Sequence, residues 1–186
     1  MNIQYVGEHI MAGTLGRLFI WISFISLVLS ITLYVLSLRS KDKAALYTKL
    51  AGNAFWLHFI SLLGGIGALY YLIGNHCFEY SYVWQYSSRD MPLKYIVSCF
   101  WAGQEGSYLV WAFWQGIIGL WLLRTSKEWK NWVMPVFATG QFFLVSMVLG
   151  FNLGGFHVGG SPFGLLRNMP QNMGEELFKQ ANYLDF

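Results

Sequence analysis

The chain has 186 residues, of which 55% are hydrophobic and only 11% are charged. Soluble domains carry about 25% charged residues. This composition, together with a mean hydropathy of +0.43, therefore excludes an ordinary soluble domain and indicates a membrane protein. The formal net charge is +3, and no run of Lys or Arg alternates with aromatic residues, which excludes a nucleic-acid-binding protein.

Four apolar segments define the predicted fold, because each is long enough to cross a hydrocarbon core of about 30 Å. They are residues 18–38, 51–73, 95–123 and 133–153. The sequence predicts an all-α fold, a polytopic membrane bundle of four transmembrane helices that together form one domain, residues 1–153. We expect the outer surface of this domain to contact membrane lipid.

The third segment is longer than one crossing requires. Residues 107–123 carry no charge, whereas residues 92–106 contain Pro, Lys and Glu. We therefore predict that residues 92–106 form an interfacial lead-in that bends near Gly103 or Gly106. Beyond the fourth segment, Gly, Pro and Asn are spread through residues 154–186, which predicts an irregular tail on the outer side of the membrane.

Lys and Arg gather in two of the predicted loops. Residues 39–50 and 124–131 contain seven basic residues among 20, whereas residues 1–17, 74–94 and 154–186 contain five among 71. Because cytoplasmic loops are enriched in Lys and Arg, the first two loops are predicted to be cytoplasmic. Both termini are then predicted to lie on the outer, periplasmic side.

The two cysteines, Cys77 and Cys99, make no C-x-x-C pair and have no zinc or haem-attachment spacing. They are predicted to be isolated thiols in the protein core. The alternative is one disulfide on the outer side of the membrane, because both residues lie near the same predicted face.

The third segment carries the polar and aromatic residues that packing does not require. If it is one continuous helix, six side chains share a face about 120° wide; these are Trp101, Gln104, Glu105, Tyr108, Trp111 and Gln115. A carboxylate at mid-bilayer costs about 2.5–3.5 kcal/mol, so this face should turn away from lipid. One interpretation is a groove wall in which indole rings stack on a flat ligand and the polar residues orient it. The alternative is an interfacial anchor, with Trp101 in the aromatic belt and Glu105 near the helix N-terminus.

The second segment combines small residues with a histidine. Ser61 and Gly65, and Gly64 and Ala68, form two small-x-x-x-small pairs, which favour close helix packing. His58 lies at the edge of that face. An intramembrane histidine is a candidate for function, as a haem ligand or a hydrogen-bond donor, and the alternative is a histidine that only bonds to a neighbouring polar group.

No enzyme motif is present. The sequence has no nucleophile elbow, no H-E-x-x-H and no dinucleotide fingerprint, so no catalytic residue and no metal site is predicted. The remaining histidines, His9, His76 and His157, lie outside the apolar segments and are expected to be ordinary surface residues.

Three segments resemble parts of one known family. Residues 101–111 read WAGQEGSYLVW, residues 82–93 form a loop that leads into that helix, and residues 161–166 read SPFGLL. They are similar to the W-x-x-x-E-G-S-x-x-x-W motif, the preceding outer loop and the N-P-F segment of the haem-handling CcmF/CcsA-type membrane proteins of cytochrome c maturation. The chain resembles the N-terminal part of that family, with Ser161 in place of the usual Asn.

The resemblance implies a protein that presents haem at the outer membrane face for attachment to the thiols of apocytochrome c. It implies haem b as cofactor, apocytochrome c and other cytochrome c maturation proteins as partners, and the bacterial inner membrane as location. The family's W-G-x-x-W-x-W-D segment and its haem-ligating histidines have no counterpart here. No haem ligand is therefore carried over, and we expect a fragment, truncated after residue 186, or one half of a split protein.

Two other functions stay open at this stage. The glycine-rich second segment would also suit a structural or transporter subunit of a membrane complex that has no haem role. Glu105 and His58 could instead serve a quinone site in an electron-transfer subunit, although no redox centre to pair with it is recognisable. Because the sequence motifs favour haem handling, the cofactor-binding residues predicted are Trp101, Gln104, Glu105, Tyr108, Trp111 and His58.

Overall fold

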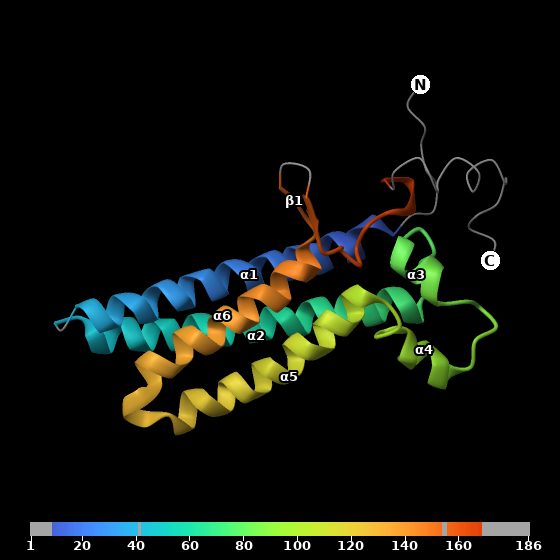
Figure 1. Ribbon diagram of the computed structural model, residues 1–186. Coiled ribbons are helices and arrows are strands. Elements are labelled where there is room, and N and C mark those ends of the chain that lie inside the picture. The colour runs from blue at the N-terminus through green and yellow to red at the C-terminus, as the bar shows by residue number, and fades with distance from the viewer. Residues whose placement is uncertain (1–8, 41, 154–155, 169–186) are drawn as a thin grey trace.

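A computed structural model describes residues 9–40, 42–153 and 156–168, and the molecule is an elongated helical bundle (Figure 1). Its four long helices are α1 (Ile10–Arg39), α2 (Ala44–Gly74), α5 (Gln104–Thr125) and α6 (Lys130–Leu149). Each is long and apolar enough to cross a membrane, α6 together with the 3₁₀ turn η1 (Lys127–Trp129) that precedes it. The predicted all-helical, four-span membrane fold is confirmed.

The helix bounds differ from the predicted ones at several ends. α1 and α2 have 30 and 31 residues, a length of about 45 Å, so both extend beyond the hydrocarbon core. The third span begins at Gln104 rather than residue 95, because the chain turns at residues 100–103. The fourth ends at Leu149 rather than residue 153, because Gly150 takes a left-handed conformation with φ of 66°.

Short elements connect the spans. α3 (Ser81–Tyr86) and α4 (Leu93–Cys99) lie between α2 and α5, so the predicted lead-in contains a short helix and bends at Gly103. A hairpin of β1 (Phe151–Leu153) and β2 (Phe156–Val158) follows α6, and η2 (Leu166–Asn168) closes the described chain. The predicted irregular tail is therefore wrong for residues 156–158, which pair with β1. Residues 154–155 and 169–186 lie outside the described part.

Helix packing follows the small residues. α1 runs along α2, α6 crosses α1 and also contacts α5, and α5 touches α2 (Figure 1). A Cβ atom on Gly64 would lie 2.9 Å from the Phe19 ring, and one on Gly65 would press on Ile20. Glycines on α2 thus let α1 approach closely, as the small-x-x-x-small pairs predict.

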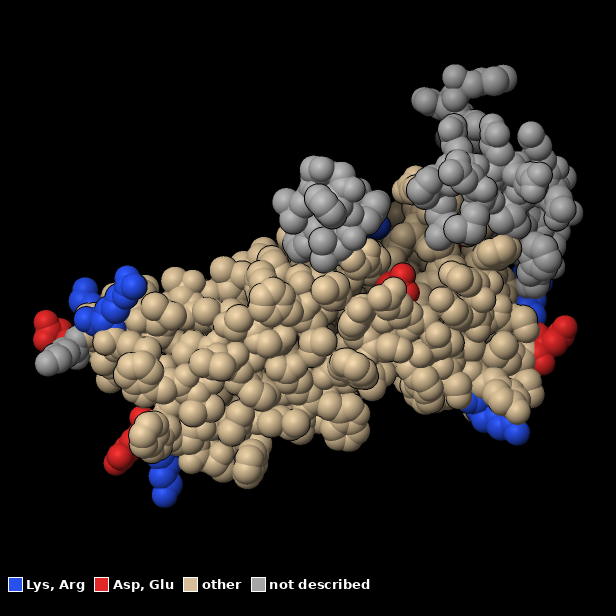
Figure 2. Space-filling model, viewed as in Figure 1, with Lys and Arg blue, Asp and Glu red and all other residues tan. Residues whose placement is uncertain are grey.

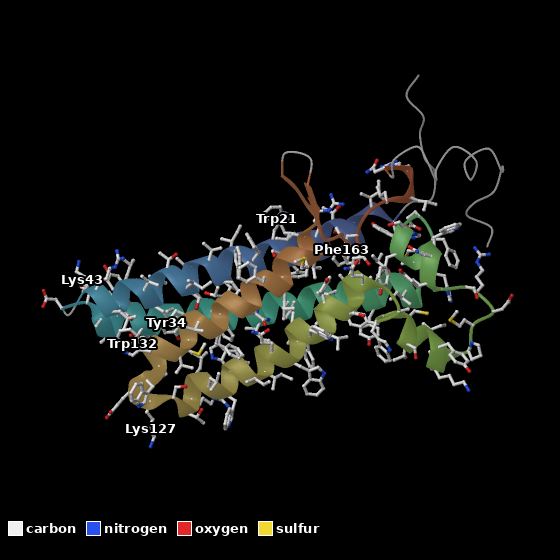
Figure 3. All side chains as sticks on the ribbon, viewed as in Figure 1. Trp21, Tyr34, Lys43, Lys127, Trp132 and Phe163 are labelled. Atoms are coloured by element: carbon white, nitrogen blue, oxygen red, sulfur yellow. The ribbon has the colours of Figure 1, made fainter. Side chains whose placement is uncertain are left out.

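Charged side chains gather at the two ends of the bundle, and the face between them is largely uncharged (Figure 2). Lys43 and Lys127 lie together at one end, and Phe163 lies toward the other (Figure 3). Between the ends, many large apolar residues are exposed, such as Leu29, Ile60 and Ile118. An exposed apolar belt with charges confined to its borders is the surface expected of a multi-pass membrane protein.

Candidate functional site around residues 101–111

The site begins where α4 ends and the chain reverses into α5. The Tyr82 hydroxyl lies 3.1 Å from the carbonyl oxygen of Cys99 and 2.8 Å from that of Phe100, and the Gly103 N–H donates to it at 3.2 Å. Phe100 also stacks on Tyr70 of α2, with ring centroids 4.3 Å apart. These buried contacts hold the turn against the bundle, because its backbone groups lack helical partners.

Gly106 belongs to the same turn. A Cβ at this position would collide with the carbonyl oxygen of Phe100 and with the Tyr82 hydroxyl. The glycine that follows Glu105 is therefore needed for close backbone approach, not for a special dihedral angle. Ser107 bonds back to the carbonyl oxygen of Trp101 at 3.0 Å, so the E-G-S part of the motif builds the turn.

Glu105 lies in the first turn of α5 and is half-buried. A Cβ on Gly160 would lie 2.6 Å from its Oε1 atom, so the carboxylate sits beneath the segment that follows the β-hairpin. Gly160 itself is fixed by its N–H bond to the Met147 carbonyl of α6, at 3.0 Å. Glu105 therefore faces protein, and its charge is favourable at a helix N-terminus.

The predicted polar and aromatic face of the third segment, here called the aromatic stripe, is divided by the start of α5: Trp101 precedes the helix, and the other five residues belong to it. Gln104 donates to the Tyr108 hydroxyl at 3.0 Å, and Trp111 continues the same side of α5 with 64% of its surface exposed. Gln115 is tied to α6 through the Phe137 carbonyl at 3.3 Å. Trp101 is also exposed, but it precedes the start of α5, so the helical phase that groups it with the other residues does not apply.

His58 lies away from this stripe, in the middle of the bundle, and is fully buried. Its Nδ1 atom is 2.8 Å from Ser23 Oγ, and its Nε2 atom is 3.0 Å from Gln141 Nε2. The Gln141 amide also donates to the Ala112 carbonyl at 2.8 Å, which fixes the position of its nitrogen. Because an amide nitrogen only donates, His58 Nε2 accepts, and the ring links α1, α2 and α6.

Both ring nitrogens of His58 are thus already bonded to protein groups. Axial ligation of haem iron would require Nε2 or Nδ1 to give up its partner inside an apolar interior, where an unpaired donor costs about 1–3 kcal/mol. Haem ligation by His58 remains a prediction, and the described geometry gives the side chain a packing role.

A polar cluster at the same end as the turn was not predicted from the sequence. Glu79 is buried and accepts the His9 N–H at 2.8 Å, with His9 Nδ1 3.4 Å from its carboxylate. The neighbouring Tyr80 hydroxyl accepts the Gly13 N–H at 3.1 Å and donates to the His9 carbonyl at 3.0 Å. These partners lie about 70 residues apart, so no local spacing could have indicated them.

The Sγ atom of Cys77 joins this cluster. The donor atoms of His9, Cys77 and Glu79 lie within 4.8 Å of one another, and nitrogen, sulfur and carboxylate oxygen are all zinc ligands. Among the described residues these three are the group that could hold a metal ion. A search for zinc-ligand spacing in the sequence does not detect this group, because His9 comes from a distant part of the chain.

The two cysteines are free and buried, as the isolated-thiol interpretation predicts. Cys99 Sγ lies 2.8 Å from the Tyr86 carbonyl, and burial raises the pKa of this thiol. Burial and the nearby Glu79 carboxylate raise the pKa of Cys77 to about 11. Both side chains are therefore neutral thiols at physiological pH.

Residues 161–166 connect the end of the described chain to its beginning. Phe163 is buried and packs over Gly16 of α1, and its carbonyl accepts from Arg17 at 3.0 Å. The Gly164 carbonyl accepts from the Ser81 N–H at 2.9 Å. The S-P-F-G segment thus braces the end of α1 and α3, close to the cluster around Glu79.

The comparisons with known proteins agree with the motifs. No protein-family model matches the chain. The cytochrome c-type biogenesis protein CcmF of Pseudomonas fluorescens is 36% identical over 81 residues, which are 44% of this chain and 12% of that protein. The solved structure of cytochrome c heme lyase CcmF matches 91% of this chain and 27% of its own chain, with a TM-score of 0.73 and 22% identity.

The chain spans 12% and 27% of the lengths of the two proteins that it matches. The structural match covers nearly all of this chain. Together, the two matches confirm the resemblance that the motif at residues 101–111 indicates: this multi-pass membrane chain has a CcmF-like fold, and 81 of its residues are similar in sequence to part of CcmF.

Proposed function

We propose that this chain takes part in c-type cytochrome maturation by forming part of a haem-handling membrane cavity, from which haem b is delivered to apocytochrome c. The observation that carries the proposal is the structural match to a haem lyase over 91% of the chain. The E-G-S motif supports it, because it resembles the motif of the haem-handling family and its residues build the turn that places Glu105 and the aromatic stripe.

The geometry suits a positioning role. Gln104, Tyr108 and Trp111 line one side of α5, and the latter ring is largely exposed. Indole and phenol rings can stack on a flat porphyrin, and an ordered polar group can orient its propionates or the incoming thiols. The haem supplies the reactive chemistry when it is bound, while these residues would hold it in place at one end of the bundle.

The proposal includes location and partners. The bacterial inner membrane, with both termini on the periplasmic side, is consistent with the basic loops at residues 39–50 and 124–131. Apocytochrome c and other maturation proteins would then meet the chain at the end that carries Glu105, the turn and residues 161–166.

The test is Glu105→Gln in a cell that depends on the complete maturation system. We expect a lower yield of holo-cytochrome c, measured by covalent haem staining, at an unchanged level of this protein on an immunoblot. The matched control is Glu128→Gln, which removes the same charge from an exposed position in η1. Wild-type yield with Glu105→Gln would contradict a role for this carboxylate.

The aromatic stripe has an equally close control. Trp111 and Trp132 are both 64% exposed, but Trp132 lies at the opposite end of the bundle (Figure 3). We expect Trp111→Ala to lower the holo-cytochrome yield and Trp132→Ala to leave it unchanged. Equal yields from the two variants would contradict a haem-facing stripe.

A further inference from the structure

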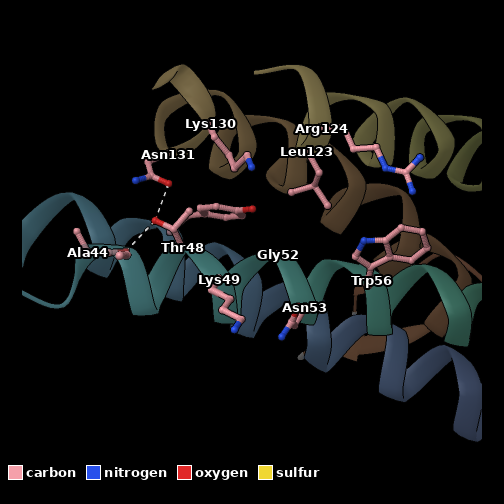
Figure 4. Close-up of a pocket in the computed structure, with 12 residues that line it drawn as sticks. Ala44, Thr48, Lys49, Gly52, Asn53, Trp56, Leu123, Arg124, Lys130 and Asn131 are labelled. Atoms are coloured by element: carbon pink, nitrogen blue, oxygen red, sulfur yellow. Dashed lines mark hydrogen bonds between the residues drawn. The ribbon is translucent and has the colours of Figure 1, made fainter. Parts of the chain in front are cut away.

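A cavity of about 590 Å³ lies at the end of the bundle opposite the turn. It is formed between the start of α2, the end of α5 and the start of α6, with one residue from α1. Figure 4 shows Thr48, Gly52 and Trp56 of α2 on one side, and Leu123, Arg124 and Lys130 on the other. The proposed haem-handling function makes no use of this cavity.

The cavity is electropositive for three reasons. Lys49, Arg124 and Lys130 line it, and none of these makes an ion pair with any described residue. No Asp or Glu is among the residues that line it. Ala44 and Asn131 place the first turns of α2 and α6 in the wall. Two positive helix ends therefore outnumber the one negative end, that of α5, which Leu123 and Arg124 bring to the cavity.

Polar groups in the wall are held in position. The Thr48 hydroxyl lies 2.9 Å from the Asn131 amide oxygen and 2.8 Å from the Ala44 carbonyl, which joins α2 to α6 beside the cavity (Figure 4). The Arg124 guanidinium lies over the Trp56 ring, 5.9 Å from its centroid. The cation is thus placed at the border between the polar wall and the apolar surface of the helices.

Tyr34 gives a second, independent indication of a ligand. Its side chain is fully buried, it lines the cavity, and its hydroxyl has no hydrogen-bond partner among the described residues. The hydroxyl is 3.8 Å from the Cβ position of Gly52, another lining residue. Buried hydroxyls are normally satisfied, so an unpaired O–H in a cavity that three cations also line points to an acceptor that the described chain does not supply.

We propose that this cavity binds a phosphate group, with Lys49, Arg124 and Lys130 as counter-ions and the Tyr34 hydroxyl as a hydrogen-bond donor. The phosphate of an anionic phospholipid and a free phosphate share this chemistry. The lipid is the source that the surroundings favour, because exposed Leu46 and Leu50 of α2 continue from the cavity region onto the apolar surface. Cationic pockets between membrane helices bind anionic headgroups in this way.

The test is native mass spectrometry of the full chain in a mild detergent, titrated with phosphatidylglycerol or with phosphatidylcholine of the same acyl chains in 0.15 M salt. We expect tighter binding of phosphatidylglycerol. The triple variant Lys49→Gln/Arg124→Gln/Lys130→Gln should weaken that binding about a hundredfold, or about fivefold for each cation. Tyr34→Phe should weaken it about tenfold, because a hydrogen bond to a charged group is lost.

A matched control removes the same charge from the same end of the molecule. Arg39, Lys43 and Lys127 do not line the cavity, and two of them lie at the Tyr34 end of the bundle (Figure 3). Exposed charges outside the wall act on a bound phosphate only through screening salt solution, so their triple change to Gln should alter binding by less than about threefold. Equal losses from the two triple variants would overturn the proposal.

Two further measurements complete the test. Tyr34→Phe should leave thermal stability without lipid unchanged or raised, since it removes an unpaired buried group; unchanged phosphatidylglycerol binding by this variant would overturn the proposal. Inorganic phosphate at 10 mM is added as competitor: displacement of the lipid would assign the site to soluble phosphate, and no displacement would assign it to the headgroup. Holo-cytochrome yield is not a readout here, so failure of this proposal is separate from failure of the proposed function.

Discussion

The hydroxyl of Tyr82 lies 2.8 Å from the carbonyl oxygen of Phe100, so a residue of α3 fixes the point at which α4 ends. The Tyr82 hydroxyl oxygen also accepts the N–H of Gly103, the residue that precedes α5. One buried side chain therefore serves both helix ends. The position of Glu105, two residues further on, depends on this contact.

Tyr82→Phe should destabilise the chain. The change removes one hydroxyl that serves three backbone groups in a buried turn, and we expect a loss of about 1–3 kcal/mol in the free energy of unfolding. The measurement is a denaturation curve of the purified chain in detergent. Tyr86→Phe is the control, because the Tyr86 ring packs with its centroid 4.9 Å from that of Tyr82 and its hydroxyl makes no hydrogen bond to any described residue. Equal stability of the two variants would show that the hydroxyl contact is not needed.

Gly106→Ala should also destabilise the chain, by about 1–3 kcal/mol, because the added methyl group meets the backbone of Phe100. Gly67→Ala is the control, since a Cβ there would have nothing within 4 Å. Alanine should be neutral or stabilising by up to about 1 kcal/mol inside α2. Thermal unfolding of the two variants measures the difference in stability between them. Equal unfolding temperatures would show that the turn adapts to the methyl group and would contradict the prediction.

Gln141→Leu tests the polar contacts at the centre of the bundle. The change removes the donor to His58 Nε2 and to the Ala112 carbonyl. It leaves the histidine nitrogen unpaired in an apolar interior, whereas the carbonyl keeps its backbone bond within α5. We expect a loss of about 1–2 kcal/mol, the upper range for hydrogen bonds between membrane helices.

The matched control for Gln141→Leu is Gln115→Leu, whose amide makes one longer bond to the Phe137 carbonyl from a half-buried position. Its loss should be less than half as large. A double variant with His58→Leu measures the coupling between the two side chains. Strict additivity of the two changes would contradict the bond that is described.

The buried thiol of Cys77 predicts that the stability of the chain depends on pH. Because burial and the Glu79 carboxylate raise the pKa of Cys77 to about 11, the folded protein disfavours the thiolate. The contribution of the neutral Cys77 thiol to the free energy of unfolding is then fully present below pH 9, the ordinary pKa of the group. It is lost as the pH rises toward 11. Denaturation midpoints measured from pH 7 to pH 11 check this. A Cys77→Ser variant, with a much higher hydroxyl pKa, should lose less stability over that range.

The same thiols should resist modification. At pH 8, the Cys77 pKa near 11 leaves about a hundredfold less thiolate than a pKa of 9. Burial also raises the pKa of Cys99, and both side chains are shielded. Maleimide should therefore label neither cysteine in the native membrane, and should label both after unfolding. A cysteine introduced at the exposed Ser88 provides the positive control, and rapid native labelling of Cys77 would contradict its burial.

The existence and number of the spans could be predicted because hydropathy is a local property. The helices are longer than the apolar runs; α1, for example, extends beyond residues 18–38 at both ends. Hydropathy does not detect these extensions, because a helix can continue through polar residues outside the bilayer. The end of α6 was predicted too late, although Gly150 is a typical helix terminator. The glycine pair at 154–155 stands between Phe-Asn-Leu at 151–153 and Phe-His-Val at 156–158. These two triplets alternate apolar and polar residues, and this pattern is a hairpin signal in the sequence.

The candidate site could be predicted only in part. The motif indicated that residues 101–111 matter, and Gly103 indicated the break. The motif alone could not indicate that Glu105 lies beneath Gly160 or that Tyr82 holds the turn, because these contacts join residues that are distant in sequence. The assumption of one continuous helix placed Trp101 in phase with Trp111, and the turn at residues 100–103 removes that relation.

The bond between Arg17 and the Phe163 carbonyl closes a loop of 146 residues. During synthesis from the N-terminus at about 5–20 residues per second, α1 enters the membrane on the order of ten seconds before Phe163 leaves the ribosome. The start of the first helix therefore acquires its final neighbours only when the last described segment arrives. The first span is therefore inserted into the membrane before the contacts between α1 and residues 161–166 can form.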